Sequence, residues 1–148
     1  MQNPPPGQGY GNQYGAAPAA PGASGKSAIG LDGNLAAALG YPIGVLAIIN
    51  LVMEKENKFV RFHAIQSLVL IVAYIVTFIV LMVLGMFLTI GLSLIDSSLA
   101  IIGLLVYALM GLVVLAFFAG LIIAAVKAYQ GQIFKLPIVG NIAEKFNK

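Results

Sequence analysis

The chain alternates long apolar runs with short polar stretches, and three of the runs contain no Asp, Glu, Lys or Arg: residues 33–53, 64–95 and 97–126. A helix crosses the hydrocarbon core of a bilayer, roughly 30 Å thick, with about 20 apolar residues. Because lipid offers no hydrogen-bond partners, each run is expected to be helical. The pattern therefore predicts an all-α integral membrane protein with three transmembrane helices, at about 35–53, 62–93 and 98–128.

The first of these runs contains a break. Pro42 removes one backbone hydrogen bond and clashes with the preceding turn, which predicts a kink. Gly40 and Gly44 lie four residues apart, so that one face of the helix would allow close approach of a neighbour. A short re-entrant segment is the alternative to a full crossing.

The other two runs carry packing signals. A continuous helix over residues 64–95 would be about 48 Å long, which implies tilt, a bend or protrusion into the headgroups. The third run carries a stripe of small residues, and such stripes favour close contacts between helices in lipid. We expect an intrachain contact there in preference to a contact with a second subunit. The stripe consists of Ala116, Gly120, Ala124 and Ala128.

The two ends differ from the apolar centre. Residues 1–33 hold five of the seven prolines and eight of the seventeen glycines, a composition that predicts a disordered tail before a membrane domain at 34–148. At the other end, Gly131 is expected to end the third helix. Pro137 would begin a short amphipathic helix, about 137–147, at the membrane interface. Lys135, Lys145 and Lys148 would then lie near anionic lipid.

The basic residues suggest an orientation. Three lie in the loop 54–63 and four in the segment 127–148, whereas the turn at Asp96 has none and the tail has one. The positive-inside rule then places the first loop and the C-terminus in the cytoplasm. With three crossings, the tail and the Asp96 turn would lie outside. This arrangement shows no basic face for nucleic acid.

The composition offers little for chemistry. Only 9% of the residues are charged and none is Cys, so thiolate chemistry is excluded. His63 is the only histidine and lacks companion ligands at zinc spacing, which leaves a polar contact at the membrane surface or a pH-sensitive contact. No charged residue lies inside the three apolar runs, which disfavours a proton-coupled transporter. We expect no enzyme activity, no metal and no cofactor.

The segment KFVRFHAIQSL at 58–68 resembles a family of small uncharacterised prokaryotic membrane proteins, whose hallmark is an FHA-x-[QE] segment entering the middle span. The stretches LGYPIGVLAIINL and AYQGQIFKLPIVGNIA agree with that resemblance, which covers about residues 35–142. The family is distantly similar to the Tic-twenty component of the chloroplast inner envelope, proposed to line a protein-import channel. The resemblance implies a location in the inner or plasma membrane of a prokaryotic cell. It also implies structural roles for the matching residues, which are Phe59, Arg61, Phe62, His63, Gln66, Gly131 and Pro137.

These observations predict a structural or interaction subunit of a membrane complex. Its partners would be membrane lipids and either another protein or further copies of the chain. The alternative is a channel-like or translocon-like component of the Tic-twenty type. That alternative requires a polar groove near Asn50, Gln66 and Ser67.

Overall fold

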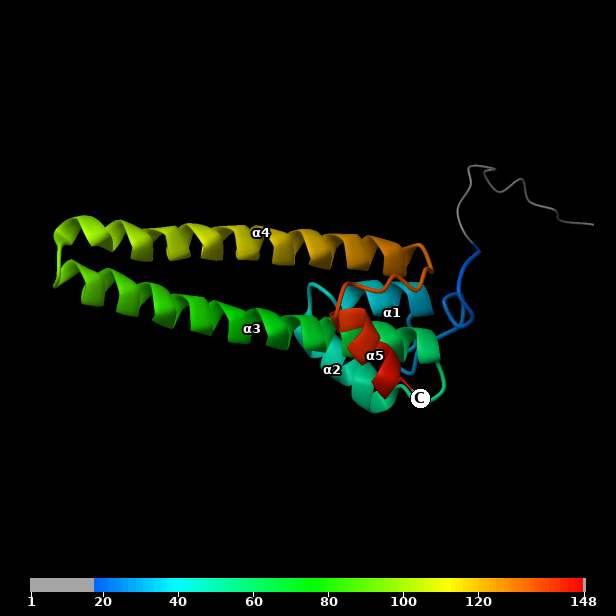
Figure 1. Ribbon diagram of the computed structural model, residues 1–148. Helices are drawn as coiled ribbons and strands as arrows, with labels where there is room; N and C mark the ends of the chain where they lie inside the picture. Colours follow the sequence, from blue (N-terminus) through cyan, green and yellow to red (C-terminus); the bar gives the residue numbers. More distant parts are fainter. Residues whose placement is uncertain (1–17, 148) are drawn as a thin grey trace, which may run out of the picture.

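The computed structural model describes residues 18–147, and the named elements in that part of the chain are all helices (Figure 1). Two long antiparallel helices form a hairpin, and the short elements gather at one end of it, which we call the base. The elements are α1 (Gly33–Leu39), α2 (Gly44–Met53), α3 (Lys58–Ser93), the 3₁₀ turn η1 (Ser97–Leu99), α4 (Ala100–Tyr129) and α5 (Val139–Phe146).

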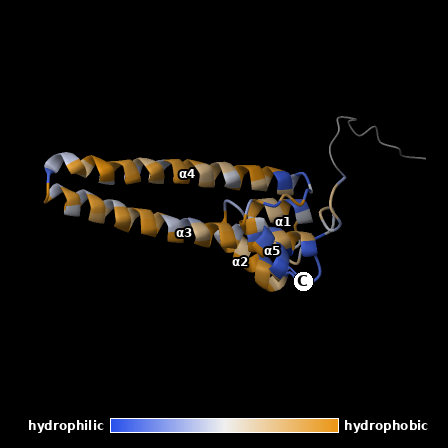
Figure 2. Ribbon diagram, viewed as in Figure 1, coloured by the Kyte–Doolittle hydropathy of each residue, from blue (hydrophilic) through white to orange (hydrophobic). Residues whose placement is uncertain are grey.

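The hairpin of α3 and α4 is apolar along most of its length (Figure 2). Within residues 18–147, the segments Lys58–Ser93 and Ser97–Tyr129 are long and apolar enough to cross a membrane. Their large side chains are largely exposed; Phe87, for example, is 72% exposed. A water-soluble protein rarely leaves a continuous apolar surface of this size uncovered. The all-helical membrane architecture predicted from the sequence is therefore confirmed, with two candidate crossings.

The predicted first span, 35–53, differs from the structure. It is divided into α1, beside α4, and α2, beside α3, and neither helix has the length that a crossing requires (Figure 1). The physical cause is Pro42, which cannot continue a helix and also restricts the residue before it. Gly40 and Gly44 consequently do not share one helix face: Gly40 packs near Ala47, and Gly44 packs near Ile71 of α3.

The segment before α1 also differs from the predicted disordered tail. Residues 18–32 pack on the base, where the Ala20 N–H donates to the Gly131 carbonyl at 2.7 Å. The side-chain amide of Asn57 donates to the Gly22 carbonyl at 2.8 Å. Small residues make this packing possible, because a side chain at Gly33 would overlap the Gly22 carbonyl. This segment therefore lies at the same end as the first loop, not at the opposite end. The rest of the predicted tail, 1–17, falls outside the described residues.

Small residues also set the spacing of the helices. Ala124 and Ala128 are buried in one core cluster with Ala36 and Ala37 of α1. Leu136 lies 3.8 Å from the position that a Cβ at Gly120 would occupy. The second half of the small-residue stripe thus makes contacts within the chain. Ala116 lines a shallow apolar hollow between α3 and α4.

Farther from the base, α3 and α4 are held by close contacts of a different kind. Tyr107 packs on Gly85, and a Cβ at Gly103 would overlap Thr89. The turn that joins the two helices is capped by Asp96, whose carboxylate accepts hydrogen bonds from the Ser98 hydroxyl at 2.7 Å and the Ser98 N–H at 2.8 Å. These bonds lower the pKa of Asp96 below its usual value.

The contact at Gly103 should control the stability of the hairpin. Replacing Gly103 with Leu forces α3 and α4 apart, and overpacking of this kind costs about 1–3 kcal/mol. The Gly111→Leu variant is the matched control, because nothing lies within 4 Å of a Cβ at that position of α4. Unfolding in mixed micelles, followed by circular dichroism, should show a loss of stability for Gly103→Leu only. Equal stability of the two variants would contradict the close crossing.

Candidate functional site

The candidate site begins at the first turns of α3. The Asn57 side chain caps this helix by accepting hydrogen bonds from the N–H groups of Phe59 and Val60. Three residues apart on a helix, His63 and Gln66 lie on one face. Both side chains are fully buried at the base, where they meet the connection between α1 and α2.

A chain of hydrogen bonds joins these two side chains to Tyr41. The Gln66 amide donates to the Tyr41 oxygen at 2.7 Å, and the Tyr41 oxygen lies 2.9 Å from His63 Nδ1. His63 Nε2 lies 3.2 Å from the Gln132 carbonyl. Because a carbonyl can only accept, Nε2 carries the ring proton, and Nδ1 accepts from Tyr41. We call Tyr41, His63 and Gln66 the polar latch; its geometry fits a neutral imidazole.

The polar latch holds the segment that joins α4 to α5, residues 131–138, which we call the strap. Besides the His63 contact, the Gln66 amide donates to the Phe134 carbonyl at 3.0 Å, and the Leu136 N–H donates to the Gln66 carbonyl oxygen at 3.2 Å. Gly131 begins the strap with a φ of 74°, the left-handed conformation that commonly ends a helix. Every hydrogen bond between the latch and the strap is made to the strap's backbone.

Aromatic rings enclose the imidazole. The ring centroid of Phe59 lies 4.7 Å from that of His63, and those of Phe62 and Tyr41 lie at 5.2 and 5.8 Å, all in edge-on arrangements. Such contacts fix the ring orientation and exclude water. The structure thus brings Phe59, Phe62, His63 and Gln66 together.

The remaining motif residues lie apart from the latch. Arg61 is half-buried, and within residues 18–147 its buried Nε has no hydrogen-bond partner. Pro137 does not begin the last helix, which starts at Val139 after a tight turn at Ile138. Pro137 therefore directs the chain from the strap into α5, back toward the start of α3.

Sequence reasoning did not identify two residues at the latch, Tyr41 within it and Gly140 beside it. Tyr41 lies in the first apolar run, directly before Pro42, where the helix is interrupted. A polar tyrosine at that interruption was the sequence feature that could have indicated it. Gly140 allows α5 to approach the latch, because a Cβ there would come within 2.8 Å of Gln66 Oε1. A glycine near the start of an amphipathic helix was the signal in that case.

The three polar residues expected to line a groove are instead used inside the protein. The Asn50 amide donates to the Ala36 carbonyl at 2.9 Å and joins α2 to α1. The Ser67 hydroxyl donates to the Gly40 carbonyl at 2.8 Å and joins α3 to the end of α1. Asn50, Ser67 and Gln66 are all buried, so their polar atoms bond to neighbouring segments.

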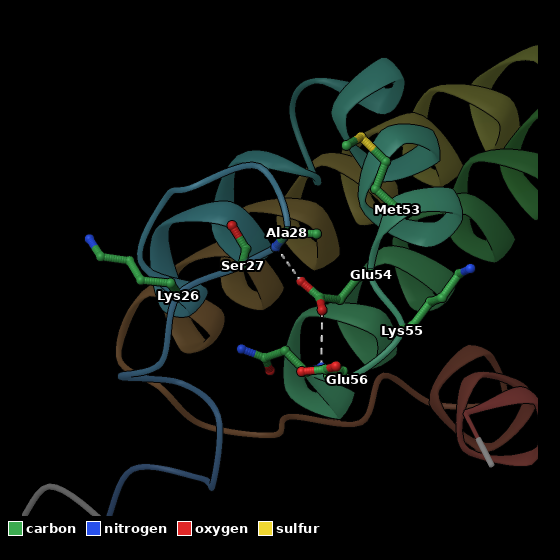
Figure 3. A pocket seen from close by; sticks show the side chains of 8 residues that line it. Lys26, Ser27, Ala28, Met53, Glu54, Lys55 and Glu56 are labelled. Carbon is green, nitrogen blue, oxygen red and sulfur yellow. Dashed lines mark hydrogen bonds between the residues drawn. The ribbon is translucent and has the colours of Figure 1, made fainter.

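A second polar cluster surrounds Glu54 in the first loop (Figure 3). Its buried carboxylate accepts hydrogen bonds from the Ala28 N–H at 2.7 Å and the Asn57 N–H at 3.0 Å. A cavity of about 410 Å³ adjoins it and is lined by both basic and acidic side chains, Lys26, Lys55 and Glu56 among them. Within residues 18–147, His, Asp and Glu form no group of three that could hold a metal ion. The contacts of Glu54 tie the segment before α1 to the first loop.

The predicted lipid-facing lysines have different surroundings. Lys135 forms an exposed ion pair with Glu144 at 2.7 Å. Lys145 is exposed on α5, and Lys148 falls outside the described residues. The far end of α5 is fixed by the Asn147 amide, which donates to the Lys58 carbonyl at 2.9 Å. Helix α5 thus runs along the start of α3, from Gln66 toward Lys58.

Loss of the latch should release the strap. The Gln66→Leu variant leaves the Phe134 carbonyl and the Leu136 N–H without partners, which should cost roughly 2–4 kcal/mol. The Tyr41→Phe variant should cost about 1–3 kcal/mol, because His63 Nδ1 loses its donor. Trypsin cleavage after the exposed Lys135 should accelerate in both variants. The control is Tyr129→Phe, at an exposed tyrosine. Cleavage of Gln66→Leu at the wild-type rate would contradict the latch.

Comparison with known proteins places this architecture in a family. The model of the magnetosome magnetite crystal formation protein family matches residues 28–143, from just before α1 into α5. The chain is 39% identical over 125 residues to the UPF0132 membrane protein MJ1443 of Methanocaldococcus jannaschii, covering 84% of this chain and 96% of that protein. It is also 39% identical over 113 residues to a UPF0132 membrane protein of Archaeoglobus fulgidus, covering 76% of this chain and 92% of the relative. No solved structure matches. The chain therefore belongs to the magnetosome magnetite crystal formation protein family.

Proposed function

We propose that this chain is a structural or interaction subunit of a prokaryotic membrane complex. It consists of a transmembrane hairpin and a base whose segments are held together by buried hydrogen bonds. The observation that carries this proposal is the use of polar groups at the base. The buried side chains Tyr41, Asn50, His63, Gln66 and Ser67 all bond to other segments of the chain. The crossing helices present apolar side chains outward. This arrangement favours a structural role in a membrane protein complex.

The length of α3 supports two crossings with a re-entrant hairpin. Its 36 residues extend about 54 Å, whereas the hydrocarbon core needs only about 20 of them. The apolar residues 67–93 of α3 extend about 40 Å, so they cross the core, roughly 30 Å thick, with a tilt, and the part of α3 before them lies in the interfacial region of one leaflet. The tip of the α1–α2 hairpin reaches the level of Ile71, and Val45 and Val52 on α2 are 66% and 69% exposed. We therefore assign α1 and α2 to a hairpin that enters one leaflet and returns.

The charge distribution supports a cytoplasmic base. Every Lys and Arg between residues 18 and 147 lies at this end of the molecule, whereas the opposite turn carries only Asp96. By the positive-inside rule, the first loop and the C-terminal segment are then cytoplasmic. Because two crossings return the chain to the same side, residues 18–32 are cytoplasmic as well.

The family description concerns crystal formation in magnetosomes. For this chain we propose only the role of a subunit in a membrane protein complex. The Tic-twenty alternative depends on the sequence resemblance alone. Its polar groove would need Asn50, Gln66 and Ser67 to face an open path, and in the structure these three side chains are buried and hydrogen-bonded.

Single cysteines can test the two-crossing orientation, since the chain has no Cys. Ser97→Cys in the far turn should react with a membrane-impermeant maleimide in intact cells. Ser24→Cys in the exposed segment before α1 should react only after lysis, because the base faces the cytoplasm. Labelling of both variants in intact cells would support three crossings and contradict the re-entrant hairpin.

The subunit role predicts a neighbour on the outer face of the hairpin. A photo-crosslinking residue at the exposed Leu115 of α4 should capture a second protein or a further copy of the chain in cells. The same residue at the buried Ala124 should give intrachain products only, and serves as the control. Native mass spectrometry after mild extraction should show the corresponding oligomer or complex. A partner-free monomer with no crosslink at Leu115 would contradict the proposal.

A further inference from the structure

The turn between the strap and α5 has an unusual backbone. Ile138 has a φ of 66° and a ψ of −59°, and the Val139 N–H donates to the Pro137 carbonyl at 2.7 Å. This is a γ-turn of the rare, strained form, and a β-branched residue seldom adopts it. The surrounding contacts impose the conformation: Leu136 is bonded to Gln66, and the Gly140 N–H donates to the Leu136 carbonyl at 2.8 Å.

The strained turn directs an apolar side chain away from the protein. Ile138 is 77% exposed, whereas its neighbours Leu136 and Val139 are buried. In water, Gly or Asn would fit this turn with less strain, and an exposed isoleucine would gain nothing. An apolar environment outside the chain would give the side chain a favourable contact.

The position of Ile138 identifies that environment. The turn lies beside Gln66, since Leu136 bonds to Gln66 and Gly140 approaches it. In the proposed orientation, this level of α3 is the boundary between acyl chains and headgroups. The exposed apolar side chains of α2 point outward at the same end of the molecule.

The charge at the base complements an anionic leaflet. Between residues 18 and 147, the base holds seven basic and four acidic side chains, a net charge of +3. Two of the basic residues, Lys26 and Lys135, are neutralised by ion pairs with Asp32 and Glu144. Lys145 lies exposed on α5, whose far end is fixed to Lys58. Apolar side chains above a basic rim are typical of a surface that binds anionic lipid.

We infer that the turn at Ile138 and the basic end of α5 form a binding surface for anionic phospholipid, with Ile138 among the acyl chains and Lys58 and Lys145 at the phosphate. This inference rests on the membrane orientation of the proposed function. It assigns the lipid contact to Ile138, Lys58 and Lys145, and gives Lys135 a structural ion pair instead.

A single tryptophan can measure the depth of Ile138, because the chain contains no Trp. The full chain is reconstituted in vesicles of phosphatidylcholine and phosphatidylglycerol that carry bromine on the acyl chains. Ile138→Trp should be quenched most by bromine near the headgroup, and Phe87→Trp, in the crossing part of α3, by bromine deeper in the core. Lys26→Trp, at an exposed position of the base, should stay unquenched. If Trp distorts the turn, Ile138→Cys labelled with bimane provides the same readout.

The outcomes separate the inference from the proposed function. Quenching of Phe87→Trp without quenching of Ile138→Trp overturns the lipid surface and leaves the membrane hairpin in place. Absence of quenching at Phe87→Trp overturns the proposed function itself. Blue-shifted emission at Ile138→Trp that resists brominated lipid also overturns the inference, because protein would then cover the turn.

The charge component has its own measurement. Brominated phosphatidylglycerol should quench Ile138→Trp more than brominated phosphatidylcholine does. Adding Lys58→Gln and Lys145→Gln should bring the ratio of the two effects toward one. Adding Lys26→Gln should leave the ratio unchanged, since Lys26 is already paired with Asp32. Equal quenching by both lipids in the Ile138→Trp protein would overturn the anionic preference.

Discussion

The structure depends on satisfying the buried amide of Gln66. This side chain lies where neither water nor lipid supplies hydrogen bonds, and leaving such a group unpaired is costly. Its amide donates to Tyr41 and Phe134, and its oxygen accepts from Leu136. One side chain on α3 thus connects the tip of the α1–α2 hairpin to the strap. Tyr41 extends the network to His63, and His63 returns it to the strap. The short elements gather at the base because their partners are there.

The same constraint explains why the crossing part of the hairpin is built differently. Beyond Ser67, two polar side chains of α3 bond within their own helix: the Thr89 hydroxyl donates to the Gly85 carbonyl at 2.7 Å, and the Ser93 hydroxyl to the Ile90 carbonyl at 2.8 Å. The contacts between α3 and α4 in this part are packing contacts between side chains of complementary shape. Tyr107 lies on Gly85, and Tyr74 stacks on Phe117 with a centroid distance of 4.3 Å. In lipid, where apolar burial provides little association energy, close backbone approach supplies this packing. The buried side-chain hydrogen bonds that join different elements lie at the base.

The sequence located the two candidate crossing helices well, because the absence of charge over a long run is a local signal. The predicted spans 62–93 and 98–128 lie within a few residues of α3 and α4. Hydropathy does not report direction, however, so it could not separate a crossing from a hairpin that returns at Pro42. The composition of residues 18–32 suggested disorder, yet their glycines and alanines allow close packing on the base. His63 and Gln66 were identifiable by their helical spacing. Their partner Tyr41 was not, since a contact across 22 residues leaves no periodic trace.

The polar latch determines the path of the strap's backbone but not the identity of the strap's side chains. Within the strap, His63 and Gln66 form hydrogen bonds only to backbone groups, those of Gln132, Phe134 and Leu136, so this recognition does not depend on which side chains the strap carries. Buried positions of the strap must still fit the core, as Leu136 does. Ile133 and Ile138 point outward and have no such constraint from the latch. In the proposed orientation, a bilayer beside the base accounts for their apolar character. The interior of the base thus fixes the path of the strap, whereas the proposed bilayer contact accounts for the side chains on its outer face.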